Sequence, residues 1–308
     1  MPNRTSSQPM QRILSATGPK RAVLSDWLKA LPLYPLPQHA LSRLVLHAAR
    51  ARNKHWKNAL IRWFVRTYQV DLGEAGEPDA TAYPDFNSFF TRTLRPDARP
   101  LPKDPATLIC PADGVISEIG RIDDAHLLQA KGRHFSVGEL LGGDNQLATR
   151  FHGGHFVTVY LSPRDYHRVH MPAAGELRTM IHVPGRLFSV APHTVRTIPR
   201  LFSRNERVVS LFDTAHGPLA VILVGAICVA SIETVWAGVV TPPRGRRLRR
   251  WHYPPPRYRL ARGEELGRFN MGSTVIVLVG PERVSWRDDL AATQPVRMGQ
   301  ALGRFRDT

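Results

Sequence analysis

The stretch Phe269-Asn270-Met271-Gly272-Ser273-Thr274 leads directly into five apolar residues, Val-Ile-Val-Leu-Val, at 275–279. Short apolar runs rich in β-branched residues and bounded by turn residues are typical of buried strands. Similar runs occur at 156–161, 208–212, 219–224 and 227–235, with Gly, Pro, Asn or Asp between them. No regular strand–helix alternation accompanies them, which argues against a doubly wound parallel sheet. We therefore expect an α+β protein whose larger domain, residues 71–308, is mainly antiparallel β.

Residues 1–70 have a different pattern. Up to about residue 20 the sequence is polar and aperiodic, which predicts a disordered tail. From Leu41 onward apolar residues recur at helical spacing, and Trp56 and Trp63 continue the stripe, with basic residues opposite. Arg52 and His55 interrupt it, so one imperfect helix or two helices remain open. Prolines at 32, 35 and 37 argue against a helix that reaches back further. The segment is expected to be an amphipathic helical region.

The formal charge of +17 is unusual for 308 residues. It favours an anionic partner, which composition alone leaves as nucleic acid, membrane or acidic protein. No apolar run approaches the roughly 20 residues of a spanning helix, and the first residues lack the apolar segment of a signal peptide. Cys110 and Cys228 lie beside apolar residues, which predicts buried thiols in a reducing compartment. The expected compartment is the cytosol, including its membrane face.

Ser273 has two potential catalytic partners elsewhere in the chain. Asp113 lies in Pro-Ala-Asp-Gly at 111–114, and His167 and His170 lie in Tyr-His-Arg-Val-His-Met-Pro at 166–172. A carboxylate, an imidazole and a hydroxyl can activate a serine whatever their order in the chain. Taken alone, Asp113 also fits a turn.

The two histidines also fit a zinc site together with His152 and His155. Gly153 and Gly154 suit a loop between that second pair, and no cysteine or carboxylate nearby completes a ligand set. Metal catalysis is therefore the weaker interpretation.

Seven blocks in order carry a family resemblance: FNSFFTRTLRPDARP, PADGVISEIG, VYLSPRDYHRVHMPAAGEL, VPGRLFSV, LFSRNERVVSLFDT, VGAICVASIETVWAG and GRFNMGSTVIVL. From about Tyr83 to the C-terminus the chain resembles bacterial phosphatidylserine decarboxylase proenzymes. One departure is Met271, where the family's cleavage motif usually begins with Leu. Both side chains are apolar and of similar volume, so we expect a mild effect on the rate of cleavage.

The resemblance implies that the chain cuts itself between Gly272 and Ser273, and that Ser273 becomes a pyruvoyl group. Asp113 and His170 match the acid and the base of the self-cleavage triad, and His167 matches the histidine of the decarboxylation step. The implied reaction converts phosphatidylserine to phosphatidylethanolamine and CO₂, with the pyruvoyl ketone as the electron acceptor. No metal and no nucleic acid are expected. A homodimer, peripheral on the cytoplasmic face of the inner membrane, is the implied assembly.

The charge and the tryptophans can now be interpreted together. Basic residues with Trp27, Trp56 and Trp63 favour an anchor on an anionic membrane over a merely solvated helix face. The arginine-rich run at 242–251 is predicted to be a loop, which leaves phosphate binding and simple solvation equally open.

Two other functions use part of the same pattern. A serine hydrolase would display its serine in G-x-S-x-G, which Ser273 lacks. A nucleic-acid binder would explain the charge but not the Asp, His and Ser blocks.

Overall fold

The computed structural model describes residues 23–123, 125–130, 133–227, 231–242, 247–271, 273–281 and 283–306. The predicted disordered tail, Cys228 and Gly272 lie outside the described residues. Cys110 is described, and it is buried as expected, with burial raising the pKa of its thiol to about 12.

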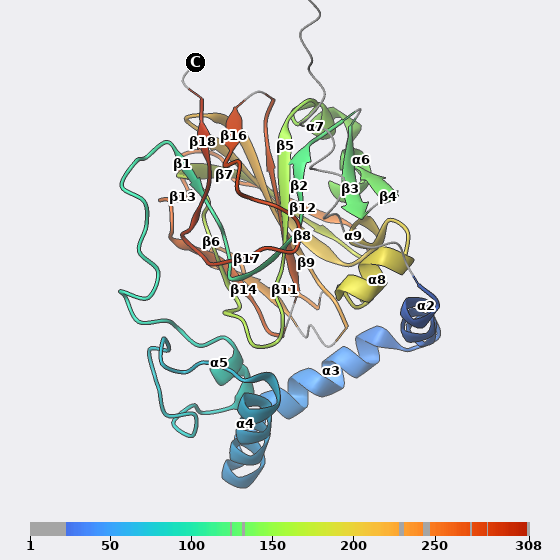
Figure 1. Ribbon diagram of the computed structural model, residues 1–308, viewed down its shortest axis with the longest axis vertical. Helices are drawn as coiled ribbons and strands as arrows, with labels where there is room; N and C mark the ends of the chain where they lie inside the picture. Colours follow the sequence, from blue (N-terminus) through green and yellow to red (C-terminus); the bar gives the residue numbers. More distant parts are fainter. Residues whose placement is uncertain are drawn as a thin grey trace, which may run out of the picture.

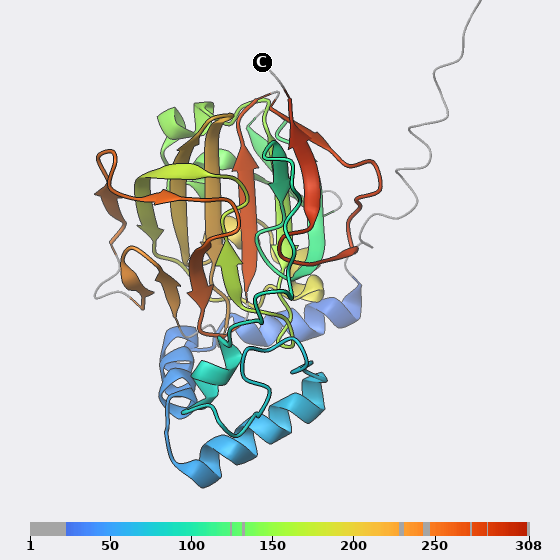
Figure 2. The same cartoon turned by 90° about the vertical axis from the view of Figure 1, so that its left-hand side faces the viewer.

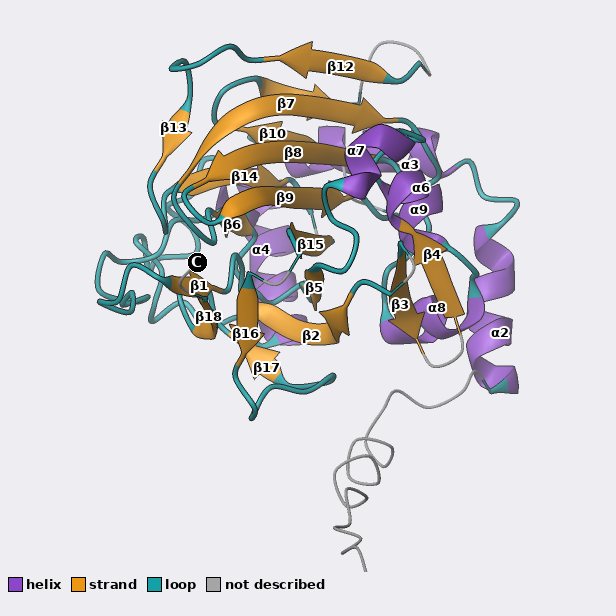
Figure 3. Ribbon diagram, turned by 90° about the horizontal axis from the view of Figure 1, so that it is seen from above, coloured by secondary structure: helices purple, strands orange, loops and turns teal. Residues whose placement is uncertain are grey.

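A large twisted sheet forms the body of the molecule (Figures 1 and 3). Within the described residues it has nine strands, and each neighbouring pair is antiparallel. The order across the sheet is β12 (Arg249–His252), β7 (Gly175–Val183), β8 (Arg207–Thr214), β9 (Gly217–Val224), β15 (Thr274–Val279), β5 (His155–Tyr160), β2 (Gly114–Arg121) and β17 (Pro295–Val296), with β13 (Arg259–Leu260) also paired to β7. The mainly antiparallel fold predicted from the sequence is confirmed.

Smaller sheets complete the β structure. They are β11 (Gly238–Thr241), β10 (Ile232–Thr234), β14 (Glu265–Phe269) and β6 (Arg168–His170) in one sheet, β1 (Thr107–Ile109), β18 (Ala301–Phe305) and β16 (Val284–Trp286) in another, and the pair β3 (His126–Ala130) and β4 (Arg133–Ser136). Figure 3 shows β10, β14 and β6 alongside the large sheet.

β15 occupies the middle of the large sheet. It pairs with β5 on one side and β9 on the other, and all six of its residues are buried. Burial on both faces explains why its sequence is a continuous apolar run rather than an alternating one. The residues that follow Ser273 therefore form a central strand of the sheet. If the chain were cut before Ser273, the backbone hydrogen bonds to β5 and β9 would keep this strand in the sheet.

Three helices lie together at one end of the β body, α3 (Gln38–Ala49), α4 (Lys54–Tyr68) and α5 (Phe86–Phe90) (Figures 1 and 2). The other helices are α2 (Leu24–Ala30), the 3₁₀ turn η1 (Leu31–Leu33), α6 (Val137–Leu140), α7 (Asn145–Thr149), α8 (Pro192–Thr197) and α9 (Leu201–Arg204). The choice between one imperfect helix and two is settled by Asn53, whose side chain accepts hydrogen bonds from the backbone N–H groups of His55 and Trp56. This N-cap starts α4 as a second helix.

The helical end has its own small apolar core. Phe64 of α4 packs against Phe86 and Phe90 of α5, with ring centroids 5.0 and 5.8 Å apart. This core contains residues from both sides of position 70. The boundary between residues 1–70 and 71–308 stays a prediction. Trp56 and Trp63 are not part of this buried set, because about half of each side chain is exposed (48% and 54%).

The predicted loop at 242–251 is wrong at its C-terminal end. Residues Arg249–His252 form β12, which pairs with β7 at the edge of the large sheet, and residues 243–246 lie outside the description. An edge strand tolerates this composition because only one side of its backbone is paired and its outward side chains reach water. Trp251 packs on the core, and Arg250 forms an ion pair with Asp144 at 2.6 Å.

Glu118 of β2 gives the fold a pH dependence. It lies opposite Thr158 of β5, only 4% of it is exposed, and its Oε1 has no hydrogen-bond partner among the described residues. Burial raises the pKa of this carboxyl to about 8 from its ordinary value of about 4.5. A carboxyl whose pKa is higher in the folded state loses its contribution to stability as the pH rises from the unfolded to the folded pKa.

We expect the free energy of unfolding to fall between pH 5 and pH 8, by roughly 2–4 kcal/mol from this group. Glu118→Gln should remove that loss, since an amide stays neutral. Thermal unfolding at both pH values measures the effect, with the exposed Glu77→Gln as the control. If the stability of wild type and of Glu118→Gln changed equally between the two pH values, Glu118 would not be neutral in the folded protein.

Candidate active site

Ser273 lies immediately before β15 and is fully buried. Its carbonyl accepts a hydrogen bond from the N–H of Leu161 at 2.9 Å, but its Oγ has no partner among the described residues. Two residues earlier, Met271 has a φ of 99°, a left-handed conformation that is uncommon and costly for a residue with a side chain. A backbone hydrogen bond thus holds the serine in place, while its hydroxyl has no partner among the described residues. The segment just before it is strained at Met271.

Backbone pairing brings the three predicted site segments together. The N–H of His170 on β6 donates to the carbonyl of Pro111, two residues before Asp113, at 2.8 Å. On its other side β6 pairs with β14, and the N–H of Phe269 donates to the carbonyl of His167 at 3.0 Å. The chain then runs from Phe269 to Ser273, so segments far apart in sequence meet at one place.

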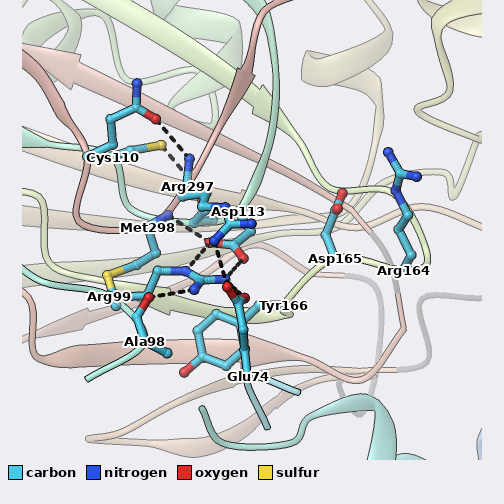
Figure 4. A network of polar contacts seen from close by, with 12 residues as sticks. Glu74, Ala98, Arg99, Cys110, Asp113, Arg164, Asp165, Tyr166, Arg297 and Met298 are labelled. Atoms are coloured by element: carbon cyan, nitrogen blue, oxygen red, sulfur yellow. Dashed lines mark hydrogen bonds and ion pairs between the residues drawn. The ribbon is translucent and has the colours of Figure 1, made fainter. Parts of the chain in front are cut away.

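The carboxylate of Asp113 is held by an arginine (Figure 4). Arg99 donates from Nε to Oδ1 at 3.0 Å and from Nη2 to Oδ2 at 2.5 Å, and the N–H of Met298 donates to Oδ1 at 2.8 Å. Arg99 also pairs with Glu74 at 2.8 Å, and Glu74 pairs with Arg297 at 2.6 Å. Asp113 is therefore an oriented, charge-paired anion.

His170 is held at both ring nitrogens. Its Nδ1 lies 2.8 Å from the carbonyl of Gly263, which can only accept, so Nδ1 carries the proton. Burial lowers the pKa of His170, so the ring is neutral and its Nε2 accepts from the Tyr166 hydroxyl at 3.0 Å. The ring thus has a basic Nε2, which Tyr166 occupies.

His167 is fully buried under the ring of Phe90, at a centroid distance of 4.0 Å. Its Nδ1 donates to the carbonyl of Asp165 at 2.8 Å, and its Nε2 has no partner among the described residues. Burial, and next the charge of Arg92, lower the pKa of His167 to about 3. Its Nε2 is therefore unprotonated and has no hydrogen-bond partner among the described residues.

The three segments are joined by backbone hydrogen bonds, but the side chains are not linked as a triad here. Asp113 is hydrogen-bonded to Arg99 rather than to His170, and the Nε2 of His170 is hydrogen-bonded to the Tyr166 hydroxyl. Arg99 and Tyr166 were not identified from the sequence. A buried carboxylate does require a cation, yet with 42 Lys and Arg in the chain this rule selects none of them.

Metal binding was the other interpretation of the histidines. Of the residues that the structure describes, no group of three or more His, Cys, Asp or Glu side chains is arranged to hold a metal ion.

Comparison with known proteins decides the family. A family model described as phosphatidylserine decarboxylase matches residues 86–304, which contain all four candidate site residues. The chain belongs to the phosphatidylserine decarboxylase family. A second model, described as PSD, matches residues 28–69, the helical segment before it.

Relatives named phosphatidylserine decarboxylase proenzyme are similar over most of their length. The protein from Alkalilimnicola ehrlichii is 61% identical over 254 residues, 82% of this chain and 88% of the relative. One from Pseudomonas aeruginosa is 58% identical over 272 residues, covering 87% and 94%. One from Azotobacter vinelandii is 56% identical over 284 residues, covering 91% and 99%. Similarity to the phosphatidylserine decarboxylase family thus extends through the helical region as well.

Proposed function

We propose that this chain is a self-processing decarboxylase that converts phosphatidylserine to phosphatidylethanolamine and CO₂ with a pyruvoyl group made from Ser273. The observation that carries the proposal is a buried serine whose hydroxyl has no partner among the described residues. It follows the end of β14 at which the N–H of Phe269 donates to the carbonyl of His167. The names of the similar proteins, decarboxylase and proenzyme, support both the reaction and the processing.

For maturation we assign the base to His170. Its Nε2 takes the Ser273 proton once Tyr166 moves aside, and Oγ attacks the carbonyl carbon of Gly272 as the Ser273 nitrogen leaves. The resulting ester eliminates the Gly272 carboxylate, and addition of water with loss of ammonia leaves the pyruvoyl ketone. Asp113 stabilises the imidazolium form of His170, and Arg99 and the Met298 N–H hold that carboxylate in place.

The pyruvoyl group supplies a ketone that condenses with the substrate amine and accepts the electrons released as CO₂ leaves. The surroundings of Ser273 fit such a group, because a fully buried position at a central strand excludes bulk water. His167 fits the proton transfer. Its Nε2, which has no partner among the described residues, can deliver a proton to the carbon that loses CO₂.

An apolar cavity of about 430 Å³ extends from the helical end to residues that flank this site. It is lined by Trp56 and Trp63 of α4, by Phe90, which covers His167, and by Met271, two residues before Ser273. We propose that this cavity takes the apolar part of the substrate where it emerges from a membrane surface. The half-exposed tryptophans of the basic helix α4 support that placement.

No helix in the described part of the chain is long and apolar enough to cross a membrane. We propose a peripheral location on the cytoplasmic face of the inner membrane, attached through electrostatic attraction and inserted tryptophans. The homodimer stays a prediction.

Incubation of processed protein with phosphatidylserine tests the reaction directly. The expected products are CO₂ and phosphatidylethanolamine in equal amounts. Fully processed protein that leaves phosphatidylserine unchanged would overturn the proposed reaction.

The membrane contact predicts a separate result. Trp56→Ser with Trp63→Ser should weaken binding to vesicles that contain anionic lipid by about tenfold or more, since two half-exposed indoles no longer insert. Self-cleavage should stay as in wild type, because neither side chain belongs to the buried core. Co-sedimentation across salt concentrations measures the binding, and salt should weaken the residual, electrostatic part most.

The control is Trp286→Ser, which replaces a half-buried tryptophan on β16, away from the helical end. Point variants test the contact more cleanly than a truncation would, because removal of residues 1–70 would take Phe64 away and expose the phenylalanines of α5 that pack against it. Unchanged sedimentation of the double variant would move the membrane contact elsewhere, with the arginines at 247–250 the next candidate.

A further inference from the structure

Arg92 is a buried guanidinium with free donors. It follows α5, only 4% of it is exposed, and its Nε and Nη1 have no hydrogen-bond partner among the described residues. Its Nη2 donates to the carbonyl of Arg164 at 3.1 Å, and its guanidinium lies 5.7 Å from the ring centroid of Phe89. Burial lowers the pKa of Arg92.

Such an arrangement is costly unless something uses it. Buried charges in proteins are paired and their N–H groups are hydrogen-bonded, since an isolated charge loses its hydration without compensation. A hydrogen bond to the Arg164 carbonyl and the ring of Phe89 hold Arg92 in place. Its other two nitrogens have no hydrogen-bond partner among the described residues. That is the arrangement expected of an anion-binding group.

Arg92 lies beside the proposed proton-transfer histidine. Arg92 and His167 bind consecutive carbonyl groups of one loop, those of Arg164 and Asp165. Phe90, two residues before Arg92, packs on the His167 ring. Arg164 and Asp165 line the same cavity as Asp113, and Figure 4 shows them to one side of the network that holds Asp113. A ligand on Arg92 would therefore lie next to the loop that holds His167.

The space in front of Arg92 is a polar cavity of about 500 Å³. Its other charged lining includes Arg99, which is committed to Asp113 and Glu74, and Asp165, whose carboxylate accepts from the N–H and hydroxyl of Ser162. Both groups are already hydrogen-bonded within the chain. Arg92 keeps donors for an incoming anion.

We propose that Arg92 binds the phosphodiester of the substrate and not its carboxylate, an assignment that rests on the proposed decarboxylation. The phosphodiester keeps its negative charge throughout the reaction, so a fixed cation binds it equally well before and after CO₂ leaves. The carboxylate loses its charge in the reaction, so pairing it with an arginine would stabilise the starting state and raise the barrier.

The test compares two soluble lipids, dihexanoyl-phosphatidylserine as substrate and dihexanoyl-phosphatidylethanolamine as inhibitor. Both contain the phosphodiester, but only the substrate has the carboxylate. In processed Arg92→Met, KM for the substrate and Ki for the inhibitor should rise by a common factor of about 10–100, the range for a lost hydrogen bond to a charged group. Arg92→Lys, which keeps the charge, should show a smaller common factor.

A rise in KM with an unchanged Ki would overturn the assignment, because it would show that Arg92 binds the carboxylate of the substrate. Unchanged values of both constants would overturn it altogether. Wild-type protein that is processed but inactive would instead contradict the proposed decarboxylation, whatever the results for the Arg92 variants. If Arg92→Met fails to fold or to cleave, the same comparison in Arg92→Lys decides, because unequal factors for the two lipids contradict the proposal.

Arg164→Met is the matched control, since Arg164 lines the same cavity but is exposed. Its common factor should stay below about fivefold, the range for an exposed charge. A larger common factor for Arg164→Met than for Arg92→Met would overturn the assignment to Arg92.

Discussion

Ser273→Ala is expected to leave the protein as one chain of 308 residues without decarboxylase activity, a loss of more than about a thousandfold. Alanine has no hydroxyl to attack the preceding carbonyl, so neither the cut nor the ketone can form. Wild-type protein should give residues 1–272 and a second chain, 273–308, whose N-terminus is blocked. Because β15 stays paired with β5 and β9, the two chains separate only under denaturing conditions, and intact mass there is the measurement.

Ser210→Ala provides the control for this result. Ser210 is also a fully buried serine of the large sheet, with an Oγ that has no partner among the described residues, but it lies on β8. Its alanine variant should cleave like wild type. A wild-type protein that is active as one uncut chain would show that the pyruvoyl proposal is wrong.

The second expected result separates the two histidines. His170→Ala and Asp113→Ala should accumulate uncut precursor, because the base or the carboxylate that stabilises its cation is missing. His167→Ala should cut at least partly, yet its processed form should release CO₂ about 10²- to 10⁴-fold more slowly. The fraction of cut chain over time and the CO₂ released per cut chain measure the two steps independently.

His155→Ala controls for damage from losing any buried imidazole. His155 is buried and its Nδ1 has no partner among the described residues, but it lies opposite Val279, at the end of β15 remote from Ser273. It should cut and decarboxylate normally. Precursor accumulation in His167→Ala together with normal cutting in His170→Ala would mean that the two roles are exchanged.

The positions of the strands could be predicted because burial leaves a local record in the sequence. β5, β8, β9 and β15 coincide with apolar runs, and β15 is apolar throughout because neighbouring strands and packed layers cover it on every side. The break between α3 and α4 was also marked locally, by residues that interrupt the stripe. β12 was missed because its arginines are tolerated only at a sheet edge, which no local pattern reveals.

The sequence by itself determined the mainly β fold, the helical N-terminal region and the residue types of the candidate site. The tertiary structure decided their partners: Arg99 for Asp113, Tyr166 and the Gly263 carbonyl for His170, and none among the described residues for the Nε2 of His167. It also decided that Trp56 and Trp63 line an open apolar cavity instead of the core. The physical reason is that periodicity records burial within one segment, whereas a hydrogen bond or an ion pair depends on which distant segments the fold brings together.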